Sequence, residues 1–180
     1  MKEKIFDGKK IIIKKLSEKD LKRVGKFRDF INSLIEEDAQ ILCNKKPSLE
    51  EELNWLKGAL DRIKKQDKVY LFAEHNGQII GSTDIGLMPF RENHVGDFGI
   101  MIKKGYRGIG LGTYLMGEIL KLAKKDLKPK PKFIKLGVFS TNKPAFGLYK
   151  KMGFKKVAKM PKFLQHKGKL VDEFVMLIDL

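Results

Sequence analysis

The feature that most constrains this chain is a glycine-rich turn between a predicted strand and a predicted helix. Within residues 100–113, Gly105, Gly108, Gly110 and Gly112 follow an apolar run and precede an amphipathic one. Glycines let the backbone approach a ligand closely, and the first turn of a helix leaves N–H groups unpaired. With the helix dipole, and with charge from Arg107 and nearby lysines, the turn is suited to bind a phosphate-type anion.

Spacing separates the classes of phosphate-binding loop. A Walker loop, G-x-x-x-x-G-K-[ST], would need a lysine where this chain has Leu111. The dinucleotide fingerprint G-x-G-x-x-G fails because Gly112 comes one residue too early, and no acidic residue follows near Lys130. A glycine turn with a purely structural role remains an alternative on this segment alone.

Hydrophobic periodicity predicts strands and helices on both sides of this turn. Ser48 and Glu51 form a capping-box pattern, and Asn76-Gly77 is a two-residue hairpin signal. Strands are predicted over 11–13, 69–75, 78–88, 95–102, 133–139, 154–165 and 170–178, and helices over 17–34, 48–60, 110–125 and 142–152. This order indicates a single α/β domain over residues 1–180, without internal repeats.

The formal net charge of +16 is concentrated in residues 121–170, which hold sixteen lysines, no arginine and one acidic residue, Asp126. Solubility, attraction of a polyanionic cofactor and contact with a nucleic-acid-bearing partner are all consistent with this excess. The stretch has few interleaved aromatic residues and matches no nucleic-acid-binding motif, so a dedicated nucleic-acid reader is not favoured.

Composition also limits the compartment and the chemistry. No apolar run approaches the ~20 residues that cross a bilayer, and residues 1–10 lack an apolar signal core, so no membrane association is expected. Cys43 is the only cysteine, which indicates a reducing, cytoplasmic compartment and a buried or half-buried thiol. His75, His94 and His166 are scattered, and no paired-cysteine motif is present, so no metal is predicted.

Two motifs resemble signatures of the GNAT acetyltransferase family. Arg107-x-x-Gly110-x-Gly112 resembles the acetyl-CoA loop of that family, Q/R-x-x-G-x-G/A. Residues 142–154 resemble its second signature, N-x-x-A-x-x-x-Y-x-x-x-G-F. The two motifs occur in the family's order, which is more specific than one glycine turn.

Two further segments extend the resemblance over about residues 9–180. Residues 96–102 resemble the fourth strand of the family, and residues 168–176 are similar to the last strand of its ribosomal-protein and polyamine acetyltransferase branch. The resemblance implies a mixed, mostly antiparallel sheet that is splayed between its fourth and fifth strands and flanked by about four helices.

The resemblance also implies acetyl-CoA as cosubstrate and a way of holding it. Backbone groups of the fourth strand would bond the pantetheine arm, N–H groups of the glycine turn would hold the pyrophosphate, and Asn142 would contact the arm. The residues expected to contact the cofactor are Ile100, Met101, Ile102, Arg107, Gly108, Ile109, Gly110, Leu111, Gly112, Thr113, Asn142 and Tyr149.

Acetyl transfer to an amine needs a base, an oxyanion donor and an acid. A free amine has a pKa near ~10.4, so a base or a water chain must reach it. Asp97 stands where many relatives carry glutamate, and it is the expected base, acting through a water relay. Alternatively, Asp97 is a plain strand-edge residue. His94 is the other candidate base. A backbone N–H near Ile100 would serve the oxyanion. Tyr149, by its motif position, would protonate the leaving thiolate, unless it is a packed helix aromatic.

The first functional hypothesis is therefore an N-acetyltransferase that acts by direct attack in a ternary complex. The acceptor would be a small amine, an amino acid, a polyamine or a protein N-terminus, and a homodimer is compatible. Residues 36–38, two glutamates and an aspartate, either attract a cationic amine or end the first helix in solvent. The alternative is a non-catalytic protein of the same fold that binds ribosome or RNA through its basic C-terminal region.

Overall fold

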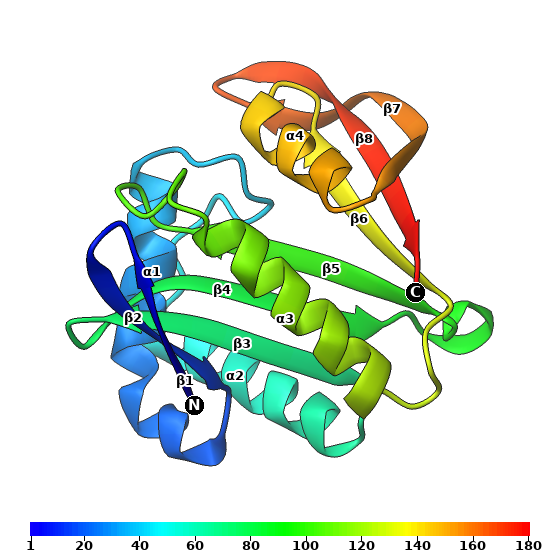
Figure 1. Ribbon diagram of the computed structural model, residues 1–180. Coiled ribbons are helices and arrows are strands. Elements are labelled where there is room, and N and C mark those ends of the chain that lie inside the picture. The colour runs from blue at the N-terminus through cyan, green and yellow to red at the C-terminus, as the bar shows by residue number, and fades with distance from the viewer.

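One eight-stranded sheet organises the computed structural model, which describes residues 1–180 (Figure 1). The strand order is β1-β2-β3-β4-β5-β6-β8-β7, and every neighbouring pair is antiparallel except β5–β6. The strands are β1 (Lys2–Phe6), β2 (Lys9–Lys15), β3 (Lys68–His75), β4 (Gln78–Leu87), β5 (Val95–Ile102), β6 (Phe133–Phe139), β7 (Lys155–His166) and β8 (Lys169–Asp179). The helices are α1 (Val24–Glu36), α2 (Leu49–Lys64), α3 (Leu111–Asp126) and α4 (Lys143–Lys151), with short 3-10 turns at Glu18–Arg23 and Phe90–Glu92. The predicted mixed, mostly antiparallel sheet with four helices is confirmed.

Helices cover both faces of the sheet. In Figure 1, α3 and α4 lie in front of it, and α1 and α2 lie behind. Along β3, Val69 and Leu71 join the core beneath α3, whereas Tyr70 and Phe72 join the core beneath α1 and α2. A strand buried on both faces reads as a continuous apolar run, as the sequence of β3 does.

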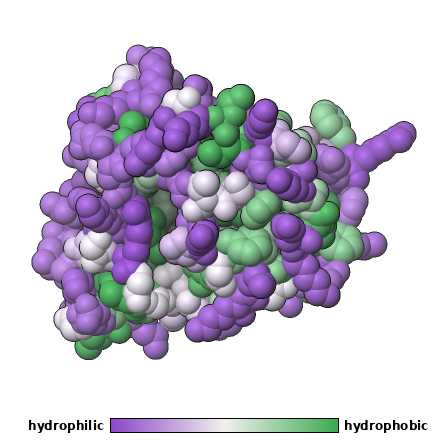
Figure 2. All heavy atoms as spheres, turned by 90° about the horizontal axis from the view of Figure 1, so that it is seen from above, coloured by the Kyte–Doolittle hydropathy of each residue, from purple (hydrophilic) through white to green (hydrophobic).

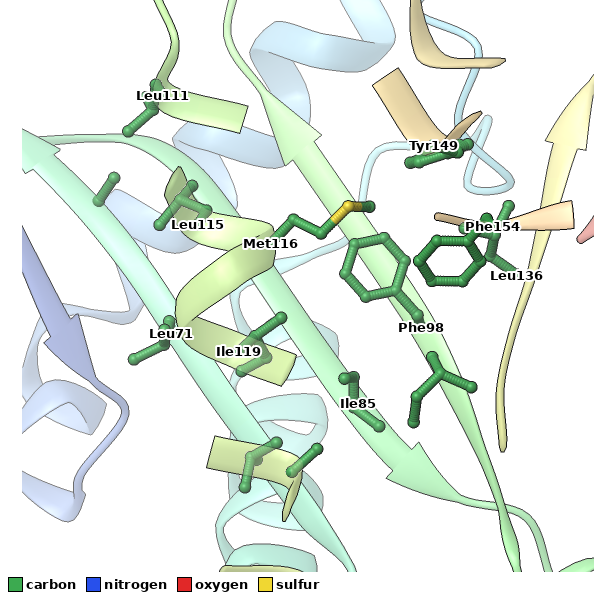
Figure 3. Packing of buried hydrophobic residues seen from close by; sticks show 14 of the residues in the cluster. Leu71, Ile85, Phe98, Leu111, Leu115, Met116, Ile119, Leu136, Tyr149 and Phe154 are labelled. Carbon is green, nitrogen blue, oxygen red and sulfur yellow. The ribbon is translucent and has the colours of Figure 1, made fainter. Parts of the chain in front are cut away.

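The core on the α3 face continues under α4. Figure 3 shows Met116 of α3 directed toward Phe98 of β5, with Phe154 and Tyr149 beside them. The ring centroids of Phe98 and Tyr149 are 6.1 Å apart, at near-perpendicular planes. This aromatic contact joins α4 to the central sheet although α4 follows a different strand.

The parallel pair β5–β6 is short. Only Val95–Asp97 pairs with Phe133–Lys135, and beyond Asp97 the two strands diverge (Figure 1). Gly96 lies at the closed end, where an added Cβ would come within 2.7 Å of side-chain carbons of both Ile134 and Ile85. The predicted splay is therefore present, between the strands at 95–102 and 133–139.

The N-terminus differs from the sequence prediction. The predicted first strand, residues 11–13, is the longer β2, and it pairs with an additional strand, β1. Asp7 and Gly8 join the two with φ of 48° and 71°, a turn that an Asp-Gly pair favours. The splay consequently falls between the fifth and sixth strands of the sheet and not between the fourth and fifth.

The capping pattern of the second helix is confirmed. Ser48 Oγ accepts a hydrogen bond from Glu51 N at 3.1 Å, and Glu51 Oε2 accepts one from Ser48 N at 2.7 Å. The first helix begins later than expected, because residues Glu18–Arg23 form a 3-10 turn before α1. None of the helices combines the length and apolar character that crossing a bilayer requires.

We expect Gly96→Ala to lower the free energy of unfolding by about 1–3 kcal/mol, because the new methyl group overpacks the closed end of the splay. Gly117→Ala is the matched control, since no heavy atom lies within 4 Å of its added Cβ and it lies within α3. That control should raise stability by about 0.5–1 kcal/mol. Urea unfolding measures both, and an unchanged Gly96→Ala would contradict the packing argument.

Candidate active site

The glycine turn before α3 presents a row of free backbone donors. Gly105, Gly108 and Gly110 have φ of 87°, 78° and 88°, values that residues with a Cβ rarely adopt. The N–H groups of residues 107–113 donate to no backbone or side-chain acceptor, and the first bonded donor after them is Tyr114 N, which reaches Gly110 O at 3.1 Å. A row of free N–H groups at a helix N-terminus fits a phosphate-type anion.

The side chain of Arg107 connects this turn to β5 and to the end of α1. Its Nε donates to the carbonyl oxygen of Ile102 at 2.7 Å, and its guanidinium forms an ion pair with Glu37 at the end of α1. The positive charge expected from Arg107 is thus partly offset by Glu37. Backbone N–H groups remain the donors for an anion.

A cavity of about 510 Å³ fills the space between the diverging strands. Its walls come from β4, β5, β6, β8, α4, the α1–α2 connection and the bulged part of β7. Because side chains alternate along a strand, Phe98 and Leu136 face α3 and α4, whereas Asp97 and Lys135 face the opposite side. The cavity thus reaches both faces of the sheet.

Tyr149 lines this cavity from α4. Its side chain is only 7% exposed and packs against Phe98 and Phe154 (Figure 3). Burial raises the pKa of Tyr149 to about 12, so its hydroxyl keeps its proton at neutral pH. Tyr149 is therefore both a packed aromatic and a proton-bearing group at the cavity wall.

Of the two candidate bases, the structure brings Asp97 into the cavity and leaves His94 outside it. Asp97 is 55% exposed and lies 3.5 Å from the ammonium of Lys135. His94 lies at the closed end of the splay, with its ring 6.2 Å from that of Phe133.

Two carboxylates that the sequence motifs did not single out line the same cavity. Glu173 of β8 lies against Gly137 of β6, where an added Cβ would be 2.1 Å from Glu173 Oε1. Burial raises the pKa of Glu173, opposed by the attraction of Lys135. Burial also raises the pKa of Asp84 on β4, opposed by its ion pair with Lys68.

Asp84 and Glu173 lie on strands that are far apart in the sequence, so only the fold brings them to one cavity. A charged residue within an otherwise apolar strand was the sequence signal that could have singled out each of them. No group of three or more His, Cys, Asp or Glu side chains is arranged as metal ligands.

The other expected cofactor contacts are distributed along the opening. Ile100 and Met101 line the cavity, whereas the carbonyl of Ile102 accepts the hydrogen bond from Arg107. Asn142 lines it too, but its Oδ1 accepts from Ala145 N at 3.2 Å as the N-cap of α4. The side-chain amide of Asn142 is its remaining donor toward the cavity.

The acidic residues at the end of α1 are paired. Glu36 binds Lys46 at 2.7 Å, Glu37 binds Arg107, and Asp38 lies 3.8 Å from Lys167. None of the three acids lines the cavity. They join α1 to the glycine turn and to the β7–β8 turn, so the structure favours the structural interpretation over attraction of an amine.

The lysines of residues 121–170 belong to α3, β6, α4, β7, β8 and the loops between them, and most are exposed. Figure 2 looks down on the side that carries α4, β7 and β8 and shows hydrophilic residues interspersed with apolar ones. Lys143, Lys150 and Lys151 of α4 are all exposed there.

A second cavity of about 420 Å³ lies between α1, α2 and β3. Glu52 of α2 lines it and is only 6% exposed, and its carboxylate makes no hydrogen bond or ion pair within the protein. Burial raises the pKa of Glu52 to about 7.

Cys43 and Met101 line both cavities. Cys43 is exposed, contrary to the expected buried or half-buried thiol.

The fold and the turn define an α/β protein with a row of unpaired N–H groups at a helix N-terminus beside a splayed sheet. The sequence model of the acetyltransferase (GNAT) family matches residues 29–154. The chain belongs to this family.

Three known proteins illustrate the relationship. The L-amino acid N-acetyltransferase AaaT of Escherichia coli (strain K12) is 32% identical over 103 residues, covering 56% of this chain and 62% of that protein, which is less than two thirds of its length. A GNAT-family acetyltransferase structure from Streptococcus pneumoniae has a TM-score of 0.81 at 24% identity, covering 94% of this chain and 99% of that one. The Salmonella typhimurium yncA structure, solved with acetyl-CoA, has a TM-score of 0.78 at 19% identity, covering 94% of each.

We expect Glu52→Gln to stabilise the protein at about pH 8 but not at pH 4. The folded-state pKa of Glu52, about 7, lies above the ordinary 4.5, so the folded protein retains a proton that the unfolded chain releases. This contribution is present at low pH and is lost as the pH rises through 7. Because glutamine cannot ionise, the gain at pH 8 should be on the order of 2 kcal/mol.

Urea unfolding at several pH values measures this gain, with Glu50→Gln as the control. Glu50 lies on the same turn of α2 and is exposed. A Glu52→Gln variant whose stability difference from the parent is independent of pH would show that Glu52 is not strained by burial.

Proposed function

We propose that this protein transfers an acetyl group from acetyl-CoA to a primary amine, with both substrates bound at once in one domain spanning residues 1–180. The observation that carries the proposal is the row of free N–H groups at 107–113, which lies next to the open edge of β5 and the cavity at Tyr149. Family membership, the acetyl-CoA in the Salmonella structure and the name of the E. coli relative support it.

The chain offers groups that match the pyrophosphate and the arm of the cosubstrate. Acetyl-CoA supplies an activated acetyl thioester at the end of a long arm that carries a pyrophosphate. N–H groups of Arg107, Gly108, Ile109, Gly110, Leu111, Gly112 and Thr113 would hold the pyrophosphate. Beyond Asp97 no strand pairs with the β6-facing edge of β5, so backbone groups near Ile100 and Met101 are open to the arm. Ile102, whose carbonyl oxygen accepts from Arg107, would contact the arm next to the glycine turn. The side-chain amide of Asn142 would donate to the arm from the facing side of the cavity.

The acceptor amine would enter from the α1 and α2 side. Asp97 and Glu173 both line the cavity there, and an amine that attacks the acetyl carbon must give up a proton. Asp97 is the proposed base, acting through water because it lies on the exposed rim. Glu173 is a second acceptor for the same proton, and burial raises its pKa, which strengthens it as a base when it is ionised.

Tyr149 would act on the leaving sulfur from the α4 side. A thiol has a pKa near ~8.5, so a phenol held at about 12 remains protonated beside it and donates a hydrogen bond to the developing thiolate. In the net reaction, the proton that ends on the sulfur comes from the attacking amine, and Tyr149 retains its own proton. Base and acid thus face the reacting atoms from opposite faces of the sheet, which argues for catalysis over a purely non-catalytic binding role.

We expect CoA to raise the melting temperature of the parent protein, because the folded glycine turn alone presents the row of N–H groups. Gly110→Val should lose this shift, since the left-handed φ of 88° and the close approach both require glycine. Thermal unfolding with and without CoA measures the effect, and Gly117→Ala should keep the full shift. A folded Gly110→Val that binds CoA like the parent would exclude the turn as the pyrophosphate site.

We expect Tyr149→Phe to lower kcat by roughly 10²-fold or more while the melting temperature changes little, because only the hydroxyl is removed. Thiol release from acetyl-CoA measures the rate. Tyr114→Phe on α3 is the matched control, since Tyr114 packs against Phe6 and does not line the cavity. A kcat within twofold of the parent, with chemistry limiting, would leave Tyr149 a packing residue only.

A further inference from the structure

The second cavity adjoins the first one on the side where the acceptor would enter. Cys43 from the α1–α2 connection and Met101 from β5 belong to the walls of both and lie between them. An acceptor whose amine lies at the reacting centre would reach the second cavity by passing Cys43, which is exposed, and the unbranched side chain of Met101. The second cavity would therefore determine which acceptors bind, according to their length and the chemical group at their far end.

The walls of the second cavity are mostly apolar. Phe27 and Ile31 of α1, Trp55 of α2, Tyr70 of β3 and Met101 line it. The rings of Trp55 and Tyr70 contact edge to face, with centroids 5.7 Å apart. Such a surface suits a chain of methylene groups and offers few hydrogen bonds along its length.

Glu52 is the buried charged residue of this cavity, and its neighbours do not satisfy its carboxylate. The other charged residues that line the cavity are Lys45, Lys46 and Glu51. Lys46 is paired with Glu36, Glu51 is engaged in the cap of α2, and none of these groups bonds to Glu52. Glu52 is only 6% exposed as a residue, and its carboxylate has no partner within the protein. Such an unpaired, largely buried carboxylate costs stability, so a partner from outside the chain would reduce the cost.

We propose that this second cavity is an acceptor subsite for linear aliphatic diamines, in which Glu52 binds the distal ammonium while the methylene chain lies along Met101 and the aromatic residues. This inference rests on the proposed function and names its substrate class. A diamine supplies the positive charge that Glu52 lacks, and a monoamine of equal length leaves the carboxylate unpaired.

The acetyl transfer itself is unchanged by this subsite. The nitrogen of the near amine forms the bond to the acetyl carbon as the carbon–sulfur bond breaks. Because the amine starts as an ammonium, that nitrogen loses two protons in all. The base takes the first and passes it to solvent, and the second ends on the released thiolate. The distal ammonium keeps its charge and its contact with Glu52, so the products are an N-acetyl diamine and CoA.

The test compares amines of matched length in parent, Glu52→Gln and Glu50→Gln proteins. Putrescine and cadaverine are the diamines, butylamine and pentylamine the monoamines, and L-leucine represents amino acids. We expect the parent to favour each diamine over its monoamine by at least tenfold in kcat/KM. Glu52→Gln should remove most of this preference through KM, and Glu50→Gln should retain it.

A second readout does not depend on catalysis. Putrescine should raise the melting temperature of the CoA-saturated parent and of Glu50→Gln, but not of Glu52→Gln. Absence of this shift in the parent, equal losses for diamines and monoamines in Glu52→Gln, or a parent that prefers L-leucine would each overturn the subsite. Loss of CoA binding or of acetyl transfer to every amine would instead overturn the proposed function.

Discussion

Three residue pairs between β5 and β6 set the geometry on which the rest of the molecule depends. They hold the two halves of the sheet together at one end, with Gly96 allowing the close approach, and beyond them the strands separate. The separation leaves the backbone of β5 open beside the glycine turn and creates a cavity that reaches both faces. Every proposed step uses this opening.

The two faces of the sheet supply different chemistry to that opening. The α3 and α4 face contributes a buried phenol at Tyr149 and the free N–H groups of the turn. The opposite face contributes Asp97 and Glu173, and burial raises the pKa of Glu173. The adjoining second cavity adds Glu52, whose pKa burial also raises. Buried carboxylates cost folding free energy, and such costs concentrate at functional sites. The lysine excess of residues 121–170 is consistent with solubility, with attraction of a polyanionic cofactor and with contact with a partner.

Local signals in the sequence predicted most of the fold. Ser48 and Glu51 predicted the start of α2, Asn76-Gly77 the β3–β4 hairpin, and the glycine run the start of α3, because these devices act within a few residues. The Asp7-Gly8 turn carried the same kind of signal for β1 and was missed, since the polar N-terminal strand lacked an apolar pattern. The positions of Tyr149 and Asp97 at a common cavity followed from family motifs and not from spacing alone.

The sequence by itself determined most of the elements, the glycine turn before α3 and the place of Tyr149 in the family motif, because each depends on short-range spacing. Only the tertiary structure decided which charges are free. The charge of Arg107 is partly offset by Glu37 from seventy residues away, Glu173 occupies the space that Gly137 leaves, and Glu52 has no partner at all. The physical reason is that the burial and pairing of a charge depend on what the fold brings within a few ångströms of it, and no local pattern records that.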